Sequence, residues 1–323
     1  MTTNTTPDIT LTPDITPTPY NLIIEEIPLY NVITCPENYN SGNHGARPDD
    51  YYQILEKGNT NKWVNSFHKD YITINIYDKD IKWMQEAYKS GSYTGKFPKS
   101  FEDEKADILE RYKHLDKYFD GTKYFVRCNS VSLKYGQHGV GPYITFEQII
   151  ESLVTCIETH TPIDNKNRGI ELLTIYLLKW QKFDKYKEYR IFICNNSITA
   201  ISQQNIYEVN EFLDAFTEEE RIQIIEMHTQ IIYDSFETNI KKKIIHTSNY
   251  CIDVVILEND SLYFIEINSF GKEYAAGSAL FHWLNDEDIL QGVKTNVSHC
   301  NDNNKNDKND KNDKNSIYFR YTL

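Results

Sequence analysis

Two apolar segments in the C-terminal part of the chain constrain the fold more than any other feature. Residues 250–257 and 262–268 are rich in β-branched and aromatic side chains, which favour strands. Residues 258–261 between them are Glu, Asn, Asp and Ser, which favour a turn. The pattern predicts a β-hairpin.

The length of the turn decides which residues of this hairpin lie opposite each other. A two-residue turn at Asn259-Asp260 and a four-residue loop over 258–261 both pair Asp253 with Glu266. Because side chains alternate along a strand, Asn268 shares the face of Glu266. Opposed carboxylates repel unless a cation lies between them, and Asp, Glu and Asn oxygens are the ligands that Mg²⁺ prefers. The alternative is a solvated polar face on an exposed hairpin.

The composition narrows the class of protein. The chain has 323 residues with 40% hydrophobic content, enough for one large or two medium domains. Its net charge is −13, which argues against general nucleic-acid binding. The six cysteines lack paired spacing, which disfavours zinc and favours a reducing compartment. With no apolar run of membrane-spanning length, we expect a cytoplasmic monomer with no membrane or direct nucleic-acid partner.

Four longer segments have the periodicity of helices. They are Asp50–Phe67, Phe146–His160, Asn210–Thr238 and Tyr274–Leu290. The third has a possible break near Thr217, where that residue can cap a restarted helix.

Two basic residues, Arg127 and Lys134, lie shortly before a glycine-rich segment. Arg127 lies in an apolar strand, where an arginine needs an anionic partner. That partner is a structural carboxylate in one interpretation and a phosphate in the other. Lys134 precedes the glycine-rich segment 136–142, which could lie over phosphates. The signal is weak, because this segment matches neither a Walker A nor a Rossmann pattern.

Further candidate residues lie on two later strands. Lys179 and Trp180 end an apolar strand, and a lysine at a strand end commonly does no more than extend its charge into water. Glu188 and Arg190 occupy alternate positions, so they share one face. They can form an ion pair with each other, or Arg190 can contact a phosphate.

Seven motifs together resemble those of one known family, the cell division cycle protein 123 family. Each motif is weak alone, but their order along about residues 50–290 is specific. In this chain they are Phe-Val-Arg-Cys-Asn-Ser-Val-Ser (125–132), Leu-Leu-Lys-Trp (177–180), Glu-Tyr-Arg-Ile-Phe-Ile (188–193), Ala-Ile-Ser-Gln (200–203), Ile-Asp-Val (252–254), Phe-Ile-Glu-Ile-Asn-Ser-Phe-Gly (264–271) and Ala-Leu-Phe-His-Trp (279–283).

The resemblance implies an α+β, divergent ATP-grasp fold, with two lobes built on antiparallel sheets and a nucleotide cleft between them. Residues 21–178 would form the N-terminal part and the N-lobe, and 179–295 the C-lobe. The Thr- and Pro-rich residues 1–20 and the Asn/Asp/Lys-rich residues 296–316 are predicted to be disordered. The apolar tail 317–323 would be either a strand or a docking segment.

The resemblance also implies roles for individual residues. Asp253, Glu266 and Asn268 would hold magnesium. The nucleotide would be contacted by Arg127, Lys134, Lys179, Trp180, Glu188 and Arg190. Departures from the family pattern lie beside this site: Gln204 stands where Arg is usual, Ser269 replaces a proline, and the segment 130–136 is altered. These changes put partner specificity in question.

Three functions are compatible with these residues. The resemblance favours an ATP- and Mg²⁺-binding factor that assembles eukaryotic translation initiation factor 2 by binding its γ subunit. The alternative is an ATP-dependent carboxylate–amine ligase of the ATP-grasp superfamily, and nothing in the sequence decides whether ATP is hydrolysed. A scaffold that binds no nucleotide is disfavoured by Asp253, Glu266 and Asn268.

Overall fold

The computed structural model describes residues 18–163, 171–293 and 315–323. The segments predicted to be disordered, 1–20 and 296–316, lie outside the described residues except for 18–20 and 315–316.

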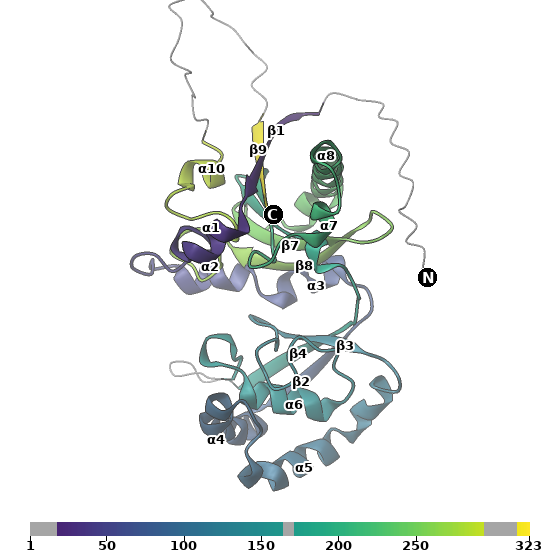
Figure 1. Cartoon of the computed structure of the whole chain (residues 1–323). Helices are drawn as coiled ribbons and strands as arrows, with labels where there is room; N and C mark the ends of the chain where they lie inside the picture. The colour runs from purple at the N-terminus through teal and green to yellow at the C-terminus, as the bar shows by residue number, and fades with distance from the viewer. Residues whose placement is uncertain (1–17, 164–170, 294–314) are drawn as a thin grey trace, which may run out of the picture.

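The described chain forms two β-sheets with helices packed around them (Figure 1). The strands are β1 (Tyr20–Ile27), β2 (Tyr71–Tyr77), β3 (Tyr124–Cys128), β4 (Leu172–Lys179), β5 (Glu188–Cys194), β6 (Ser197–Gln203), β7 (Tyr250–Ile256), β8 (Leu262–Ser269) and β9 (Asn315–Thr322). The helices are α1 (Leu29–Thr34), α2 (Tyr51–Lys57), α3 (Thr60–Phe67), α4 (Asp78–Thr94), α5 (Glu102–Arg111), α6 (Phe146–Thr155), α7 (Glu211–Asp214), α8 (Glu218–Ser235), α9 (Lys241–Lys243) and α10 (Glu287–Gln291).

The larger sheet has the strand order β1-β9-β6-β5-β7-β8. Strands β6, β5, β7 and β8 are antiparallel, whereas β9 runs parallel to both β1 and β6. The apolar tail at 317–323 is therefore a strand within the sheet, which settles the choice between strand and docking segment. One face packs against α8, where Ile224, Ile225 and Ile232 meet the apolar residues of the sheet (Figure 1). We call this sheet and its helices the C-lobe.

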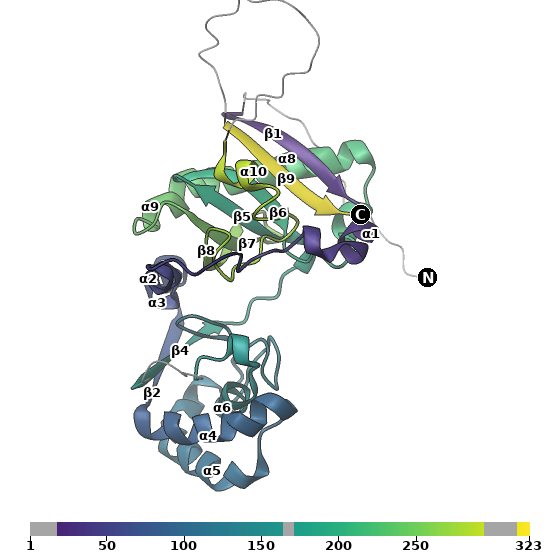
Figure 2. The same cartoon turned by 90° about the vertical axis from the view of Figure 1, so that its left-hand side faces the viewer.

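The smaller sheet has the order β2-β4-β3 and is antiparallel throughout. Its Val126, Ile175 and Leu177 pack with Ile150 and Leu153 of α6 in a second core that also includes α4 and α5. We call this unit the N-lobe; both views show it as a separate layer below the C-lobe (Figures 1 and 2). The predicted α+β fold with two lobes is confirmed, and the sheets are antiparallel, as predicted, except where β9 pairs with β1 and β6. Strand β1 pairs within the C-lobe, although it lies in the segment assigned to the N-terminal part.

Two of the predicted helices are interrupted. Asp50–Phe67 is divided into α2 and α3 at Gly58, where a Cβ atom would lie only 3.0 Å from the carbonyl oxygen of Ile267. Asn210–Thr238 is divided into α7 and α8, and Thr217 caps the restarted helix in a full capping box with Glu220. The predicted break at Thr217 is confirmed.

The helix predicted over Tyr274–Leu290 is wrong, because only α10 is helical there. The preceding residues form a loop on the C-lobe sheet that is bonded to residues far earlier in the chain. Ser41 Oγ accepts a hydrogen bond from the Trp283 amide at 2.8 Å, and Asn40 Oδ1 accepts one from the Ala279 amide at 3.2 Å. Ala279 also has a φ of 49°, which a continuing helix does not allow.

None of the described helices is both long enough and apolar enough to span a membrane.

The position of β9 predicts that the C-terminal residues stabilise the whole C-lobe. Phe319 is fully buried between β1 and β6. Phe319→Ala should lower the free energy of unfolding by about 3–5 kcal/mol because it leaves a cavity in the core. Urea unfolding measures this loss. Tyr30→Ala, at a residue that is 74% exposed, is the control and should change stability by less than about 0.5 kcal/mol. Equal stability of the Phe319→Ala variant would show that β9 is dispensable.

Candidate functional site

The β7–β8 hairpin carries the predicted carboxylate pair. Asp253 lies directly opposite Glu266, as predicted. The predicted turn, however, is wrong, because the strands are joined by a five-residue loop whose first flanking pair is Ile256 and Leu262. The register shifts by one residue next to Asp253, so that Ile265 is the extra residue of a β-bulge. The bulge restores the register at the carboxylates.

Strand β5 supplies the first counter-charge. Arg190 pairs in register with Asp253 and binds it with two hydrogen bonds, from Nε to Oδ1 at 2.8 Å and from Nη2 to Oδ2 at 2.7 Å. Its Nη1 donates to the carbonyl oxygen of Gly277 at 2.6 Å. Both charged side chains are buried. A planar guanidinium is suited to this bidentate contact, so Arg190 is held rigidly.

The N-lobe supplies the second counter-charge. Arg127 of β3 reaches across to the C-lobe, and its Nη1 donates to Glu266 Oε2 at 2.5 Å. Arg127 is only 3% exposed. Its Nε donates to Thr60 Oγ1 at 3.3 Å, and its guanidinium lies 5.3 Å from the centre of the Trp63 ring. The anionic partner of Arg127 in this structure is thus a carboxylate, and this ion pair connects the two lobes.

Asn268 completes the cluster. Its side-chain amide nitrogen lies 3.2 Å from Asp253 Oδ2 and 3.2 Å from Glu266 Oε1, so it lies between the two carboxylates. Two carboxylates and an amide are hard oxygen ligands of the kind that Mg²⁺ uses when phosphates or water supply the rest. Among the described residues, no group of three or more His, Cys, Asp or Glu could hold a metal by itself. Asp253, Glu266 and Asn268 could supply at most part of the oxygen ligands of a magnesium ion, and phosphate or water would have to supply the rest.

The charges of the cluster shift the pKa values of its acids in different directions. Burial raises the pKa of Glu188 to about 8, and the negative charges of Asp253 and Glu266 add to this effect. Burial also raises the pKa of Asp253, against the opposing effect of Arg190. The pKa of Glu266 lies well below its ordinary value, because Arg127 and a hydrogen bond with Asp253, helped by Lys134 and Arg190, outweigh the effect of burial.

The remaining residues that were predicted to contact the nucleotide do not all lie at the cluster. Lys134 is exposed, and its ammonium group lies 5.4 Å from the centre of the Tyr135 ring. Lys179 is exposed and pairs with Asp70 at 3.3 Å. Lys179 lies three residues after Tyr176, which pairs with Arg127. Because side chains alternate along a strand, Lys179 lies on the opposite face of the N-lobe sheet from Arg127. Trp180 follows at the crossing between lobes, where its amide donates to the Lys123 carbonyl.

The residues that position the two arginines were not predicted from the sequence. Thr60 and Trp63 hold Arg127 from α3, and Gly277 binds Arg190 through a backbone carbonyl. No sequence signal identifies a backbone acceptor, since any residue has one. Thr60 also donates to the Cys128 carbonyl at 2.7 Å, which ties α3 to β3.

The raised pKa of Glu188 predicts a pH dependence of stability. Between the ordinary value near 4.5 and about 8, the folded chain holds a proton on Glu188 that the unfolded chain releases. This contribution to stability therefore falls as the pH rises through that range. Glu188→Gln removes the titration, so the variant should gain stability relative to wild type from pH 5 to 8 in urea unfolding. A constant difference across this range would contradict the placement of Glu188.

Comparison with known proteins places this chain in a family. The family model D123 matches residues 147–322, more than half of the chain. A translation initiation factor eIF2 assembly protein of Candida albicans is 32% identical over 110 residues, which are 34% of this chain and 29% of that protein. The alignment thus spans less than a third of that relative.

Two solved structures share the fold. Cdc123 from Schizosaccharomyces pombe matches with a TM-score of 0.52 and 14% identity, over 83% of this chain and 97% of that one. A C-terminally truncated form of the same protein matches with a TM-score of 0.53, 16% identity and the same coverage. The predicted resemblance is confirmed, and the chain belongs to the D123 family, with the fold of Cdc123.

Proposed function

We propose that this chain binds ATP with Mg²⁺ between its lobes and acts as an assembly factor for translation initiation factor 2, through the γ subunit of that factor. Membership of the D123 family supports the proposal, as does the similarity to the translation initiation factor eIF2 assembly protein of Candida albicans. The observation that carries the nucleotide site is the buried cluster of two arginines and two carboxylates where the lobes meet.

The charges of the cluster match those of a magnesium nucleotide. Arg127 and Arg190 are bound to carboxylates in this structure. A triphosphate offers the arginines equivalent acceptors, because guanidinium groups bind phosphate oxygens, like carboxylate oxygens, with two parallel hydrogen bonds. A magnesium ion would at the same time neutralise Glu266 and Asp253. Each buried charge would exchange one partner for another, so the site can take up the ligand without leaving a charge unpaired.

Asp253, Glu266 and Asn268 would hold the magnesium ion. When bound, the ion would neutralise charge on the phosphate oxygens. Two carboxylates alone make a weak site, since Mg²⁺ in proteins commonly keeps one or two carboxylates and takes phosphate and water as its other ligands. We therefore propose that magnesium and nucleotide bind together, each raising the affinity for the other.

The other residues would contribute to different extents. Lys134 and Arg190 would face the phosphates, and Glu188, protonated at neutral pH, would add little negative charge there. Trp180 would line the nucleotide at the crossing between lobes. Lys179 would first have to leave Asp70 and turn toward the cleft.

The metal assignment predicts the behaviour of Glu266→Gln. This variant keeps the shape of the side chain but removes the charge, so Mg²⁺-dependent ATP binding should weaken at least about tenfold. Isothermal titration with ATP, with and without Mg²⁺, measures this. Glu237→Gln, which removes an acid paired with Lys241 on the C-lobe surface, is the control and should bind like wild type. Unchanged binding by Glu266→Gln would refute the metal assignment.

A second experiment separates an assembly factor from a ligase. Purified γ subunit should be retained by the immobilised chain, more strongly with ATP and Mg²⁺ than without. Incubation with ATP, Mg²⁺ and candidate carboxylates and amines should release no ADP above the background of the Glu266→Gln variant. ADP release that depends on an added amine, without retention of the γ subunit, would favour ATP-dependent carboxylate–amine ligation and refute the assembly role.

A further inference from the structure

The glycine-rich segment, which the sequence only weakly connected with phosphates, is bound firmly to helix α6. We call residues 133–142 the glycine loop. It follows β3 in the chain and returns along the free edge of that strand, with bridges from Arg127 to Ser132 and from Tyr124 to Tyr143. The loop is thus connected at both ends to the strand that carries Arg127.

The start of the glycine loop faces the candidate site. Leu133 is fully buried in the N-lobe core, next to Val126 and Cys128. Ser132 is paired with Arg127 in the first bridge, so these two side chains lie on the same side of the sheet. Lys134 follows two residues later, in the turn that the hydrogen bond from the Gly136 amide to the Leu133 carbonyl closes, and its side chain is exposed. The loop therefore carries a lysine next to the strand that holds Arg127.

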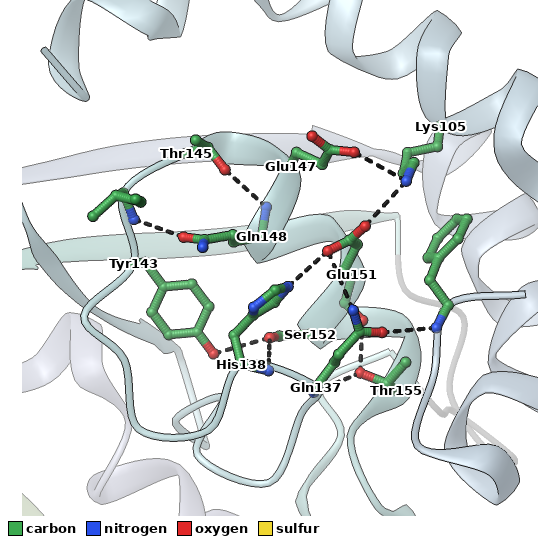
Figure 3. Close-up of polar contacts among 12 residues, drawn as sticks. Lys105, Gln137, His138, Tyr143, Thr145, Glu147, Gln148, Glu151, Ser152 and Thr155 are labelled. Carbon is green, nitrogen blue, oxygen red and sulfur yellow. Dashed lines mark hydrogen bonds and ion pairs between the residues drawn. The ribbon is translucent and has the colours of Figure 1, made fainter.

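The middle of the glycine loop is held by hydrogen bonds to α6 (Figure 3). The amide of Gln137 donates to Thr155 Oγ1 at 2.8 Å, and the amide of His138 donates to Ser152 Oγ at 3.3 Å. Gly136 packs so closely that a Cβ atom would lie 2.6 Å from the Ser152 carbonyl oxygen. Glycine is therefore required at this position for the loop to reach the helix.

Glu151 is the residue at which these contacts converge (Figure 3). Its Oε2 lies 2.6 Å from His138 Nε2 and accepts a hydrogen bond from Gln137 Nε2 at 3.5 Å, while its Oε1 accepts one from Lys105 at 3.0 Å. Burial by itself raises the pKa of Glu151, but His138 and Lys105 lower it below the ordinary value. The carboxylate is therefore charged at neutral pH.

We propose that Glu151 is a positioning residue for nucleotide binding: it fixes the glycine loop on α6 so that Lys134 is held ready at the phosphate position. This inference rests on the proposed function. In this proposal the loop is a rigid support that is already ordered before the ligand binds. Groups held in place before binding lose less conformational freedom on binding, which raises affinity.

The N-lobe offers a matched control for Glu151. Lys105 also forms ion pairs with Glu147 at 3.0 Å and Glu102 at 2.9 Å. Glu147 lies one helical turn before Glu151 on α6 and shares its lysine, but none of its contacts in the described structure is to the glycine loop. Glu147→Gln therefore reproduces the loss of a charge beside Lys105 without loosening the loop.

The test compares Glu151→Gln with Glu147→Gln by two measurements. Amide hydrogen exchange at Gln137 and His138 should be faster in Glu151→Gln and unchanged in Glu147→Gln. The dissociation constant for ATP with Mg²⁺ should rise about tenfold in Glu151→Gln only, while affinity for adenosine, which lacks phosphates, should stay the same. Equal effects of both variants on ATP binding would overturn the inference. If Glu151→Gln fails to fold, His138→Ala replaces it, with a smaller loss expected.

A double variant distinguishes positioning from general stabilisation. Lys134→Ala removes the cation that the loop is proposed to present. If Glu151 acts through Lys134, adding Glu151→Gln to Lys134→Ala should weaken ATP binding no further. Additive losses would overturn the inference. Failure of the wild-type chain to bind ATP would overturn the proposed function as well, whereas wild-type binding with Glu151→Gln unaffected would overturn only the role of Glu151.

Discussion

The ion pair between Arg127 and Glu266 joins the two lobes beside an apolar contact, in which Tyr176 and Leu178 of β4 belong to the same core as the C-lobe sheet. Arg127 and Glu266 are 139 positions apart, and each belongs to a different sheet. Removing one partner of a buried pair leaves an uncompensated charge and commonly costs about 3–5 kcal/mol, whereas replacing both by apolar side chains is often neutral. The burial of an ion pair is therefore weak evidence that the pair serves to stabilise the fold. Its position between the lobes is better explained by a ligand that exchanges partners with it.

The pair is also the end of a polar row that crosses the whole C-lobe sheet. Residues in direct register along this row are Glu25, Arg320, Ser202, Arg190, Asp253 and Glu266, one from each strand. The loop before α10 covers the row: its Leu280 amide donates to Ser202 Oγ at 3.0 Å, and its Gly277 carbonyl accepts from Arg190. Arg320 in turn binds Glu25 at 2.5 Å and Asp286 at 2.8 Å. The C-terminal strand thus supports the same loop that holds Arg190.

Local rules predicted the hairpin well and the long-range contacts poorly. Alternation and turn length placed Asp253 opposite Glu266, although the five-residue loop would have shifted the pairing without the bulge at Ile265. The insertion of β9 between β1 and β6 follows from no local pattern, since it depends on strands nearly 300 residues apart in the chain. Tyr274–Leu290 was wrongly predicted as helical, and the loop that precedes α10 buries Leu280, Phe281 and Trp283 as well as a helix would. Spacing indicates which side chains face a core but leaves the backbone between them open.

The glycine loop and the β7–β8 hairpin both use acidic side chains to hold positively charged residues in place. A buried phosphate site needs several positive charges, and these repel one another unless acids separate them. In this chain Asp253 separates Arg190 from the rest of the cluster, Glu266 holds Arg127, and Glu151 holds the loop that carries Lys134. The acids near the site therefore fall into two classes: those that would release their cation to a ligand, and those, like Glu151, that must keep theirs. Glu151 belongs to the second class because both of its carboxylate oxygens are bonded within the N-lobe, to Lys105, Gln137 and His138.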